Sequence, residues 1–271
     1  ELTYPYQILE NNTQIIKDII ENKNELSEKI INSNKPAIII GQSALKLKSG
    51  IYIFEEIKKF LTLNNKINNE WNSLNILSNN ASTVGAYDLN MIDFDNSKDI
   101  YKKLGNSYFD LVFLFGQENI NIEKSDTFIV YVGSHGDKGA EQADLILPGS
   151  AYTEQDGYFT NLEGKLQKAY KASYPPGEAK EDWQIINDLS ALIKRKKLYS
   201  NKDELVDAMI NYLSLSIENK NFNVPEYKFI DEKIVVEELD YYHSNAIARA
   251  SKTMSECKNS KINLKKTGTE G

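Results

Sequence analysis

Short apolar runs that end at glycine or proline alternate with helical patterns from the start of the chain to Pro148. Runs of strand length that are rich in β-branched residues are typical of strands buried on both faces of a parallel sheet. These runs are Ala37–Ile40, Leu111–Phe115, Thr127–Val132 and Leu145–Leu147. The helical patterns cover Thr13–Ser33, Gly50–Leu63 and Asp99–Leu104. The alternation predicts an α/β fold with a doubly wound, mostly parallel sheet that is flanked by helices.

Beyond Pro148 the pattern changes to a hairpin followed by helices. Gly157–Asn161 and Lys165–Ala169 predict two paired strands, with Gly164 at a turn position that requires a positive φ. The next helix begins with acidic residues and ends with basic ones at 194–197, as the helix dipole favours. Its predicted apolar face consists of Trp183, Ile186, Leu189 and Ile193. Further predicted elements are a helix over Asp203–Leu213, a strand over Lys233–Leu239 and a helix from Ser244 to about Cys257.

These elements predict a chain of four parts. An N-terminal segment with an amphipathic helix covers 1–35, and the α/β sheet domain covers 36–150. The hairpin and helical region over 151–257 packs on that domain, and 258–271 forms a flexible tail rich in lysine, glycine and threonine. Within the sheet domain, Trp71–Leu77 fits either a helix or a strand, and the small residues of Ser78–Asp88 suit a tight loop.

Composition excludes several classes of protein. The net charge of −7 argues against a nucleic-acid-binding protein, which usually has a basic face. The single cysteine, Cys257, cannot form an internal disulfide or supply the four ligands that an iron–sulfur cluster usually takes. No apolar run approaches the ~20 residues that a membrane-spanning helix needs. The first residue is Glu1 and not methionine, which fits a processed product, a trimmed chain or a fragment.

The loop Gly133–Ser134–His135–Gly136–Asp137 is the strongest candidate for chemistry, because serine, histidine and aspartate together suggest a hydrolase. Adjacent side chains tend to diverge, however, and no G-x-S-x-G elbow is present. We therefore favour a glycine-rich connection in which His135 and Asp137 bond to the loop backbone.

The stretches Gly41–Gln42–Ser43 and Gly116–Gln117–Glu118 also follow strands and could bring backbone N–H groups to a phosphate. Neither of them is a recognised nucleotide motif.

Three carboxylates, Glu154, Asp156 and Glu163, could serve as an acid–base pair, although a solvated or turn-stabilising role is the simpler interpretation. Cys257 is expected to be incidental, because no basic neighbour is fixed to lower its pKa. His135 and His243 are far apart in the sequence, so we expect no transition-metal site built by this chain alone.

Two stretches resemble the strand-and-hairpin signature of the molybdopterin oxidoreductases: Ala143–Glu154 and Tyr158–Gln167. Further stretches are similar to one subgroup of that family, the 75 kDa subunit of mitochondrial respiratory complex I (NADH:ubiquinone oxidoreductase). They are Val130–Ala140, Pro175–Trp183, Asp240–Tyr242 and Ile247–Met254. The resemblance covers nearly the whole chain and is weakest at 60–110 and 200–232.

This resemblance implies a structural segment of the subunit's C-terminal, molybdopterin oxidoreductase-like part. It would lie in the matrix arm at the mitochondrial inner membrane, where the complex transfers electrons from NADH to ubiquinone. The subgroup's cysteine-rich, cluster-binding region has no counterpart here. The resemblance therefore implies a split subunit or a partial chain, with the iron–sulfur half on another polypeptide as the main partner.

The resemblance also implies no catalytic, cofactor-binding or metal-binding residue on this chain, with FMN and the iron–sulfur clusters on partner subunits. Gly116 is followed by Gln117–Glu118–Asn119 where active relatives tend to place Asn-Pro. Two alternatives remain open. One is a catalytic molybdopterin-type fragment completed by another chain. The other is a stand-alone α/β module that binds a nucleotide or anion at the loops of Gly41, Gly116 and Gly133.

Overall fold

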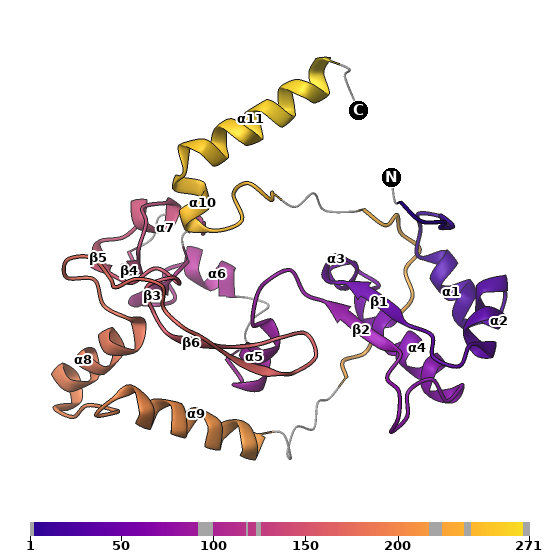
Figure 1. The fold of residues 1–271 in the computed structure, drawn as a ribbon, viewed down its shortest axis with the longest axis horizontal. Helices are drawn as coiled ribbons and strands as arrows, with labels where there is room; N and C mark the ends of the chain where they lie inside the picture. Colours follow the sequence, from indigo (N-terminus) through magenta and orange to yellow (C-terminus); the bar gives the residue numbers. More distant parts are fainter. Residues whose placement is uncertain are drawn as a thin grey trace. The chain divides into compact units, whose positions relative to one another are not determined.

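The computed structural model describes residues 3–91, 100–117, 119–122, 126–216, 224–235 and 240–267. The chain forms two compact units, and each unit contains two stretches of sequence. The first unit consists of Glu1–Thr83 and Asn221–Glu238, and the second consists of Val84–Lys220 and Leu239–Gly271. The α/β class with parallel sheets and flanking helices is confirmed (Figure 1). The units divide the predicted 36–150 domain at residue 83, so the contacts follow other boundaries than the sequence suggested.

The first unit contains a two-stranded parallel sheet with helices. Its strands are β1 (Ile38–Gly41) and β2 (Leu74–Leu77), paired in register from Ile38 with Leu74. Its helices are α1 (Gln14–Ile20), α2 (Glu25–Asn32), α3 (Gln42–Leu45) and α4 (Gly50–Leu63). Ile40 on the sheet and Ile53, Phe60 and Leu61 on α4 are buried. The expectation that the first strand is buried on both faces is wrong within this chain, because Ile39 is 66% exposed.

The single helix predicted over Thr13–Ser33 is two helices. Asn22 has a φ of 59°, which ends α1 because a right-handed helix cannot continue through a left-handed residue. The Asn24 side chain then accepts a hydrogen bond from the Leu26 N–H at 2.9 Å and caps α2. The Ser27 hydroxyl is fully buried and donates to the Ile19 carbonyl at 2.7 Å. This bond fixes α2 against the end of α1.

Two buried hydroxyls hold the returning segment 224–235 on the first unit. The Thr13 hydroxyl donates to the Ile230 carbonyl at 2.8 Å and accepts from the Glu232 N–H at 2.9 Å. The Ser49 hydroxyl donates to the same Ile230 carbonyl at 2.7 Å and accepts from the Ile230 N–H at 2.9 Å. We call these four residues the hydroxyl junction. The predicted strand over Lys233–Leu239 is reduced to one bridge between Lys233 and Asn12, and 236–239 lie outside the described residues.

The second unit is built on a three-stranded parallel sheet in the order β3-β4-β5. The strands are β3 (Leu111–Phe115), β4 (Phe128–Gly133) and β5 (Leu145–Pro148), each within one residue of its predicted bounds. Central strand β4 is buried on both faces, as its composition predicts. Ile129 and Tyr131 join one apolar cluster with Leu104, Leu114 and Ile122. Val130 and Val132 join a second cluster with Ile185.

The remaining elements of the second unit include short helices before and within the sheet. They are α5 (Thr83–Asp88), which begins at the unit boundary, α6 (Ile100–Gly105) and α7 (Lys138–Glu141). The tight loop expected over Ser78–Asp88 therefore contains a helix. The predicted hairpin is confirmed as β6 (Gly157–Thr160) and β7 (Leu166–Ala169), and Gly164 has a φ of +80°.

Four helices complete this unit: α8 (Asp182–Lys194), α9 (Lys202–Ser216), α10 (Ala246–Ala250) and α11 (Lys252–Thr267). The C-terminal helix and the buried face of α8 differ from their predictions. The helix expected to end near Cys257 continues to Thr267, so much of the predicted flexible tail is helical. Ile185 is the buried apolar residue of α8, whereas Ile186 is 42% and Ile193 71% exposed. Among the described residues, no helix is long and apolar enough to cross a membrane.

Candidate functional site at the carboxyl ends of the strands

The carboxyl ends of parallel strands are where open α/β folds bind ligands. Here three of the four glycines near the ends of β3, β4 and β5 are in close contact with protein atoms. A Cβ on Gly133 would lie 2.2 Å from the Tyr131 hydroxyl oxygen. Tyr131 is fully buried and donates its hydroxyl to the His135 carbonyl at 2.8 Å. The tyrosine side chain therefore fills the space beside Gly133 into which a Cβ would project.

Two more glycines of this edge are in close contact with backbone. A Cβ on Gly139 would lie 2.2 Å from the Gln117 carbonyl oxygen, in the loop after β3. A Cβ on Gly149 would lie 3.1 Å from the Gly133 nitrogen, and the Gly149 N–H donates to the Gly133 carbonyl at 3.0 Å. Only Gly116, with a φ of +60° and open space around it, shows a purely conformational need for glycine among these four positions. The loops after the three strands thus pack on one another.

The Ser134–His135–Asp137 grouping does not assemble into a catalytic triad. The Ser134 hydroxyl lies 2.9 Å from His135 Nδ1, but both belong to the same exposed turn. Asp137 instead caps α7 by accepting the Lys138 N–H at 2.9 Å, and it accepts Arg249 Nε at 2.6 Å. The Lys138 N–H and, after it, the Arg249 guanidinium hold the pKa of Asp137 below its ordinary value. The carboxylate is therefore committed to structure.

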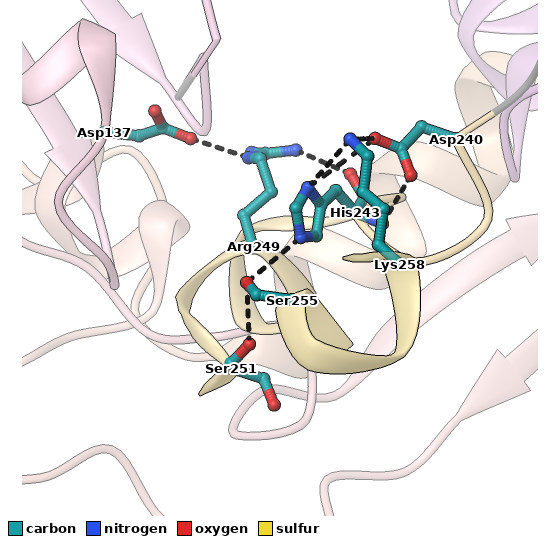
Figure 2. A network of polar contacts seen from close by, with 7 residues as sticks. All are labelled: Asp137, Asp240, His243, Arg249, Ser251, Ser255 and Lys258. Carbon is teal, nitrogen blue, oxygen red and sulfur yellow. Dashed lines mark hydrogen bonds and ion pairs between the residues drawn. The ribbon is translucent and has the colours of Figure 1, made fainter. Parts of the chain in front are cut away.

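Arg249 belongs to a polar network that fastens the C-terminal helices (Figure 2). Arg249 also donates to the His243 carbonyl at 3.4 Å, and His243 Nε2 lies 3.2 Å from the Ser255 hydroxyl. Lys258 reaches Asp240 at 2.5 Å and lies 3.4 Å from His243 Nδ1. Beside Lys258, the pKa of Asp240 is lowered. We call the Asp137–Arg249 contact the ionic junction, because it joins the loop after β4 to α10.

Two of the three candidate carboxylates, Glu154 and Glu163, make local contacts, and Asp156 bonds to the other end of the hairpin. Glu154 accepts the Ala151 N–H at 2.9 Å, and Asp156 accepts the Lys171 N–H at 2.9 Å. Glu163 lies 3.5 Å from the Asn161 side-chain nitrogen. The turn-stabilising role expected from sequence therefore holds for Glu154 and Glu163 but not for Asp156. Among the described residues, no hydrogen bond joins any two of the three carboxylates to a common partner.

The remaining candidates are also accounted for. Gln42, next to Gly41, accepts the Asn79 N–H at 2.8 Å in the first unit. Cys257 is exposed on α11, and Glu118 lies outside the described residues. Across the described ranges, no group of three or more His, Cys, Asp or Glu side chains could hold a metal ion.

A buried carboxylate that sequence reasoning missed is Glu181, which is 7% exposed at the start of α8. It forms ion pairs with Lys171 at 3.6 Å and with Lys202, and it accepts the Trp183 indole N–H at 3.0 Å. It also forms a reciprocal capping box with Gln184. The acidic residues before α8 indicated the start of a helix, but they did not indicate that one of the carboxylates would be buried. The two lysines come from the loop that follows β7 and from α9, and nothing in the sequence pairs them with Glu181.

A family model described as molybdopterin oxidoreductase matches residues 1–192 of the chain. The chain belongs to the molybdopterin oxidoreductase family. A second model, described as the C-terminal part of the G subunit of NADH-ubiquinone oxidoreductase, matches residues 217–257. The family resemblance predicted from the sequence is thereby confirmed.

Relatives match the chain almost from end to end. The NADH-ubiquinone oxidoreductase 75 kDa subunit of Reclinomonas americana is 36% identical over 269 residues, which is 94% of this chain and 38% of the relative. The G subunit of NADH-quinone oxidoreductase from Rickettsia bellii is 34% identical over 275 residues, or 98% of this chain and 39% of the relative. The chain thus spans about 38% of the length of these curated relatives.

A molybdopterin group at these strand ends would need space beside the glycines and cationic or N–H donors aimed into it. Here Tyr131 fills the space beside Gly133, the Gln117 carbonyl packs against Gly139, and Arg249 is bonded to Asp137. In the described part of the chain, protein atoms therefore fill the positions beside Gly133 and Gly139.

Proposed function

We propose that this chain is a non-catalytic structural segment of a complex I subunit of the 75 kDa type. In this role it would lie in the matrix arm at the mitochondrial inner membrane and support electron transfer from NADH to ubiquinone, the reaction of the whole complex. FMN and the iron–sulfur clusters would be on partner subunits. The main partner would be a separate polypeptide that carries the iron–sulfur half of the subunit.

The observation that carries this proposal is the nearly end-to-end match of this chain to complex I subunits. The likeness to the 75 kDa subunit of Reclinomonas americana extends over 94% of this chain, and the model of the G subunit's C-terminal part matches 217–257. The close packing around Gly133 supports a structural role for that loop over the molybdopterin-type and nucleotide-binding alternatives, because Tyr131 fills the space beside this glycine. At Gly41 and Gly116, the other two candidate glycines, a Cβ would meet no atom closer than 3.8 Å.

Native mass spectrometry of the assembly tests the partnership. The chain carries an affinity tag, is purified from the cells that make it, and its partners are identified. We expect the chain to leave the column in an assembly that oxidises NADH and contains a second, cysteine-rich polypeptide. Recovery of the chain alone, or in an assembly without NADH-oxidising activity, would contradict the proposal.

Metal and cofactor analysis tests the non-catalytic role. The chain is separated from its partners, and iron, molybdenum, pterin and flavin are measured per mole of polypeptide. We expect each of them well below one per chain, with iron and flavin recovered in the partner fraction. One molybdenum with extractable pterin on the isolated chain would instead favour the catalytic alternative.

A further inference from the structure

The end of α8 combines exposed apolar side chains with a cluster of positive charge. Leu192 is 82%, Ile193 71% and Leu198 52% exposed. Between them lie Lys194, Arg195, Lys196 and Lys197, all exposed. We call residues 192–198 the α8 end surface. Its sequence is unusual in a chain whose net charge is −7, because no acidic residue occurs from Leu189 to Lys202.

An apolar hollow adjoins this surface. It has a volume of about 530 Å³ and lies between the end of β5 and one face of α8. Leu147 and Pro148 line it from the strand, and Ile185, Leu189 and Leu192 line it from the helix. The charged residues Glu178, Lys180 and Asp188 complete its wall. The three apolar helix positions have the i, i+4, i+7 spacing of one helical face. Ile185 is buried in the core, whereas Leu192 at the far end of this face is 82% exposed and is left for another surface to cover.

The positive charge exceeds what the helix itself requires. The C-terminal end of a helix carries roughly half a negative charge, which one nearby cation offsets. Within the described residues, no ion pair is recorded for any of the four cations at 194–197. Asp188, an acid on the same helix, is already bonded to Lys180 at 2.7 Å. Lys180 and, more weakly, Lys197 lower the pKa of Asp188.

The turn that presents these cations is fixed in place. Arg195 adopts a left-handed conformation with a φ of 54°, which turns the chain back along the helix. Asn187, only 5% exposed, accepts the N–H groups of Leu198 and Tyr199 at 2.7 and 3.1 Å. The Ser190 hydroxyl donates to the Lys196 carbonyl at 3.0 Å. A surface ordered in advance loses less entropy when a partner binds.

We propose that the α8 end surface and its hollow form a docking site for an acidic amphipathic helix of another polypeptide. The apolar side chains of that helix would enter the hollow, as in other helix-in-groove contacts. Its carboxylates would pair with the cations at 194–197, which supplies the charge complementarity that selects an acidic partner. The concave shape of the hollow favours protein side chains over a flat lipid surface. This docking site goes beyond the proposed function, because it would serve any assembly that contains the chain.

A designed peptide tests the chemistry with the full chain. The probe is a labelled helix of about 18 residues, roughly five turns, with leucine on one face and glutamate elsewhere. A second peptide keeps the leucines and replaces every glutamate by lysine. We expect the acidic peptide to bind the chain, to weaken with added salt, and to bind at least about tenfold more tightly than the lysine peptide. Fluorescence anisotropy measures the affinities.

Two variants and a control locate the contact. Lys194→Glu/Lys196→Glu/Lys197→Glu reverses the charge, and Leu192→Ser/Ile193→Ser removes the apolar side chains. Both change exposed residues only, so the fold is retained. We expect each to weaken the acidic peptide on the order of tenfold. The charge-matched control Lys29→Glu/Lys102→Glu/Lys165→Glu, at exposed positions elsewhere, should change affinity less than about twofold.

Three outcomes would overturn the proposal. One is the absence of acidic-peptide binding at millimolar concentration. Another is equal binding by the wild-type chain and both α8 variants. The third is a chain that does not bind the peptide but binds phosphatidylserine vesicles, with both variants abolishing the vesicle binding. That result would assign the surface to a membrane.

Discussion

The C-terminal part of the chain is held mainly by buried hydroxyls in one unit and by an ion pair in the other. In the first unit, Thr13 and Ser49 hold the backbone of Ile230 and Glu232, and their exposed fractions are 1% and 0%. The Glu232 carboxylate also accepts the Ser49 backbone N–H at 2.8 Å. In the second unit, Arg249 holds Asp137, and both side chains are 23% exposed. Both junctions join segments more than a hundred residues apart, so each closes a long loop of the chain.

The comparison shows how burial selects the chemistry of a long-range contact. A hydroxyl can be fully buried at low cost when it both donates and accepts, as Ser49 does with Ile230. A charge needs either a partner with good geometry or some contact with water. The hydroxyl junction should therefore be stable and insensitive to salt, whereas the ionic junction should respond to salt and pH. Two variables differ at once, however, because the hydroxyls are also the more deeply buried groups.

Glu181 separates charge from burial, since it is both charged and 7% exposed. We expect Glu181→Met to lower the free energy of unfolding by roughly 2–4 kcal/mol, because it leaves Lys171, Lys202 and the Trp183 N–H without their carboxylate. Urea unfolding followed by tryptophan fluorescence measures the change. Glu178→Met, at an exposed glutamate three residues earlier, should cost less than about 0.5 kcal/mol. Equal effects at both positions would show that burial of the carboxylate is unimportant.

Ser49→Ala removes one member of the hydroxyl junction. We expect a loss of about 2 kcal/mol, because the Ile230 N–H and carbonyl lose a buried partner. The loss should be the same at low and high salt, since no charge is removed. Equilibrium unfolding at two salt concentrations measures it. Ser33→Ala, which removes an exposed hydroxyl from the same unit, serves as the control and should change stability by less than about 0.5 kcal/mol.

Arg249→Met removes the cation of the ionic junction and keeps most of the apolar stem. We expect a loss of about 1 kcal/mol at low salt, which shrinks at high salt because the pair is partly exposed to solvent. Hydrogen exchange of α10 and α11 should rise in the same variant, since Arg249 also donates to the His243 carbonyl. A salt-independent loss would contradict the distinction between the two junctions.

The strands were predictable because local signals specify them. Leu111–Phe115 is apolar at every position and is followed by Gly116, and the structure reproduces its bounds. The apolar period of α8 located the helix but not its buried edge, because a broad stripe does not tell which side meets the sheet. The break at Asn22 depends on one left-handed residue that the apolar period of Thr13–Ser33 conceals.

The junctions were not predictable from sequence, for a physical reason. Thr13 and Ser49 bond to residues at 230–232, and nothing in either local sequence distinguishes them from ordinary surface hydroxyls. At the candidate site, the turn role of Glu154 followed from local spacing, whereas the bond of Asp156 to Lys171 spans 15 positions. The bond between Asp137 and Arg249 spans 112 positions, so only the folded structure could reveal it.

The smallest expected effect is the pH response of the ionic junction. The pKa of Asp137 in the folded chain is below its ordinary value of 3.8, first because of the Lys138 N–H and then because of Arg249. A lowered carboxyl pKa stabilises the folded state above the unfolded pKa, and this stabilisation is lost as pH falls through the folded pKa. The difference in unfolding free energy between the wild-type chain and Asp137→Asn should therefore be constant from neutral pH to about pH 5 and shrink below that.

The direction of that response distinguishes a charged contact from a capping one. Asparagine can still accept the Lys138 N–H, so the cap of α7 survives in Asp137→Asn while the charge on Arg249 loses its partner. Asp156→Asn provides a matched control, because the pKa of Asp156 is also lowered, first by the Lys171 N–H, but no arginine bonds to it among the described residues. If the difference at Asp137 does not shrink in acid, the contact with Arg249 adds nothing beyond the neutral hydrogen bond. The ionic junction would then be equivalent to the hydroxyl junction, and burial alone would explain the contrast between the units.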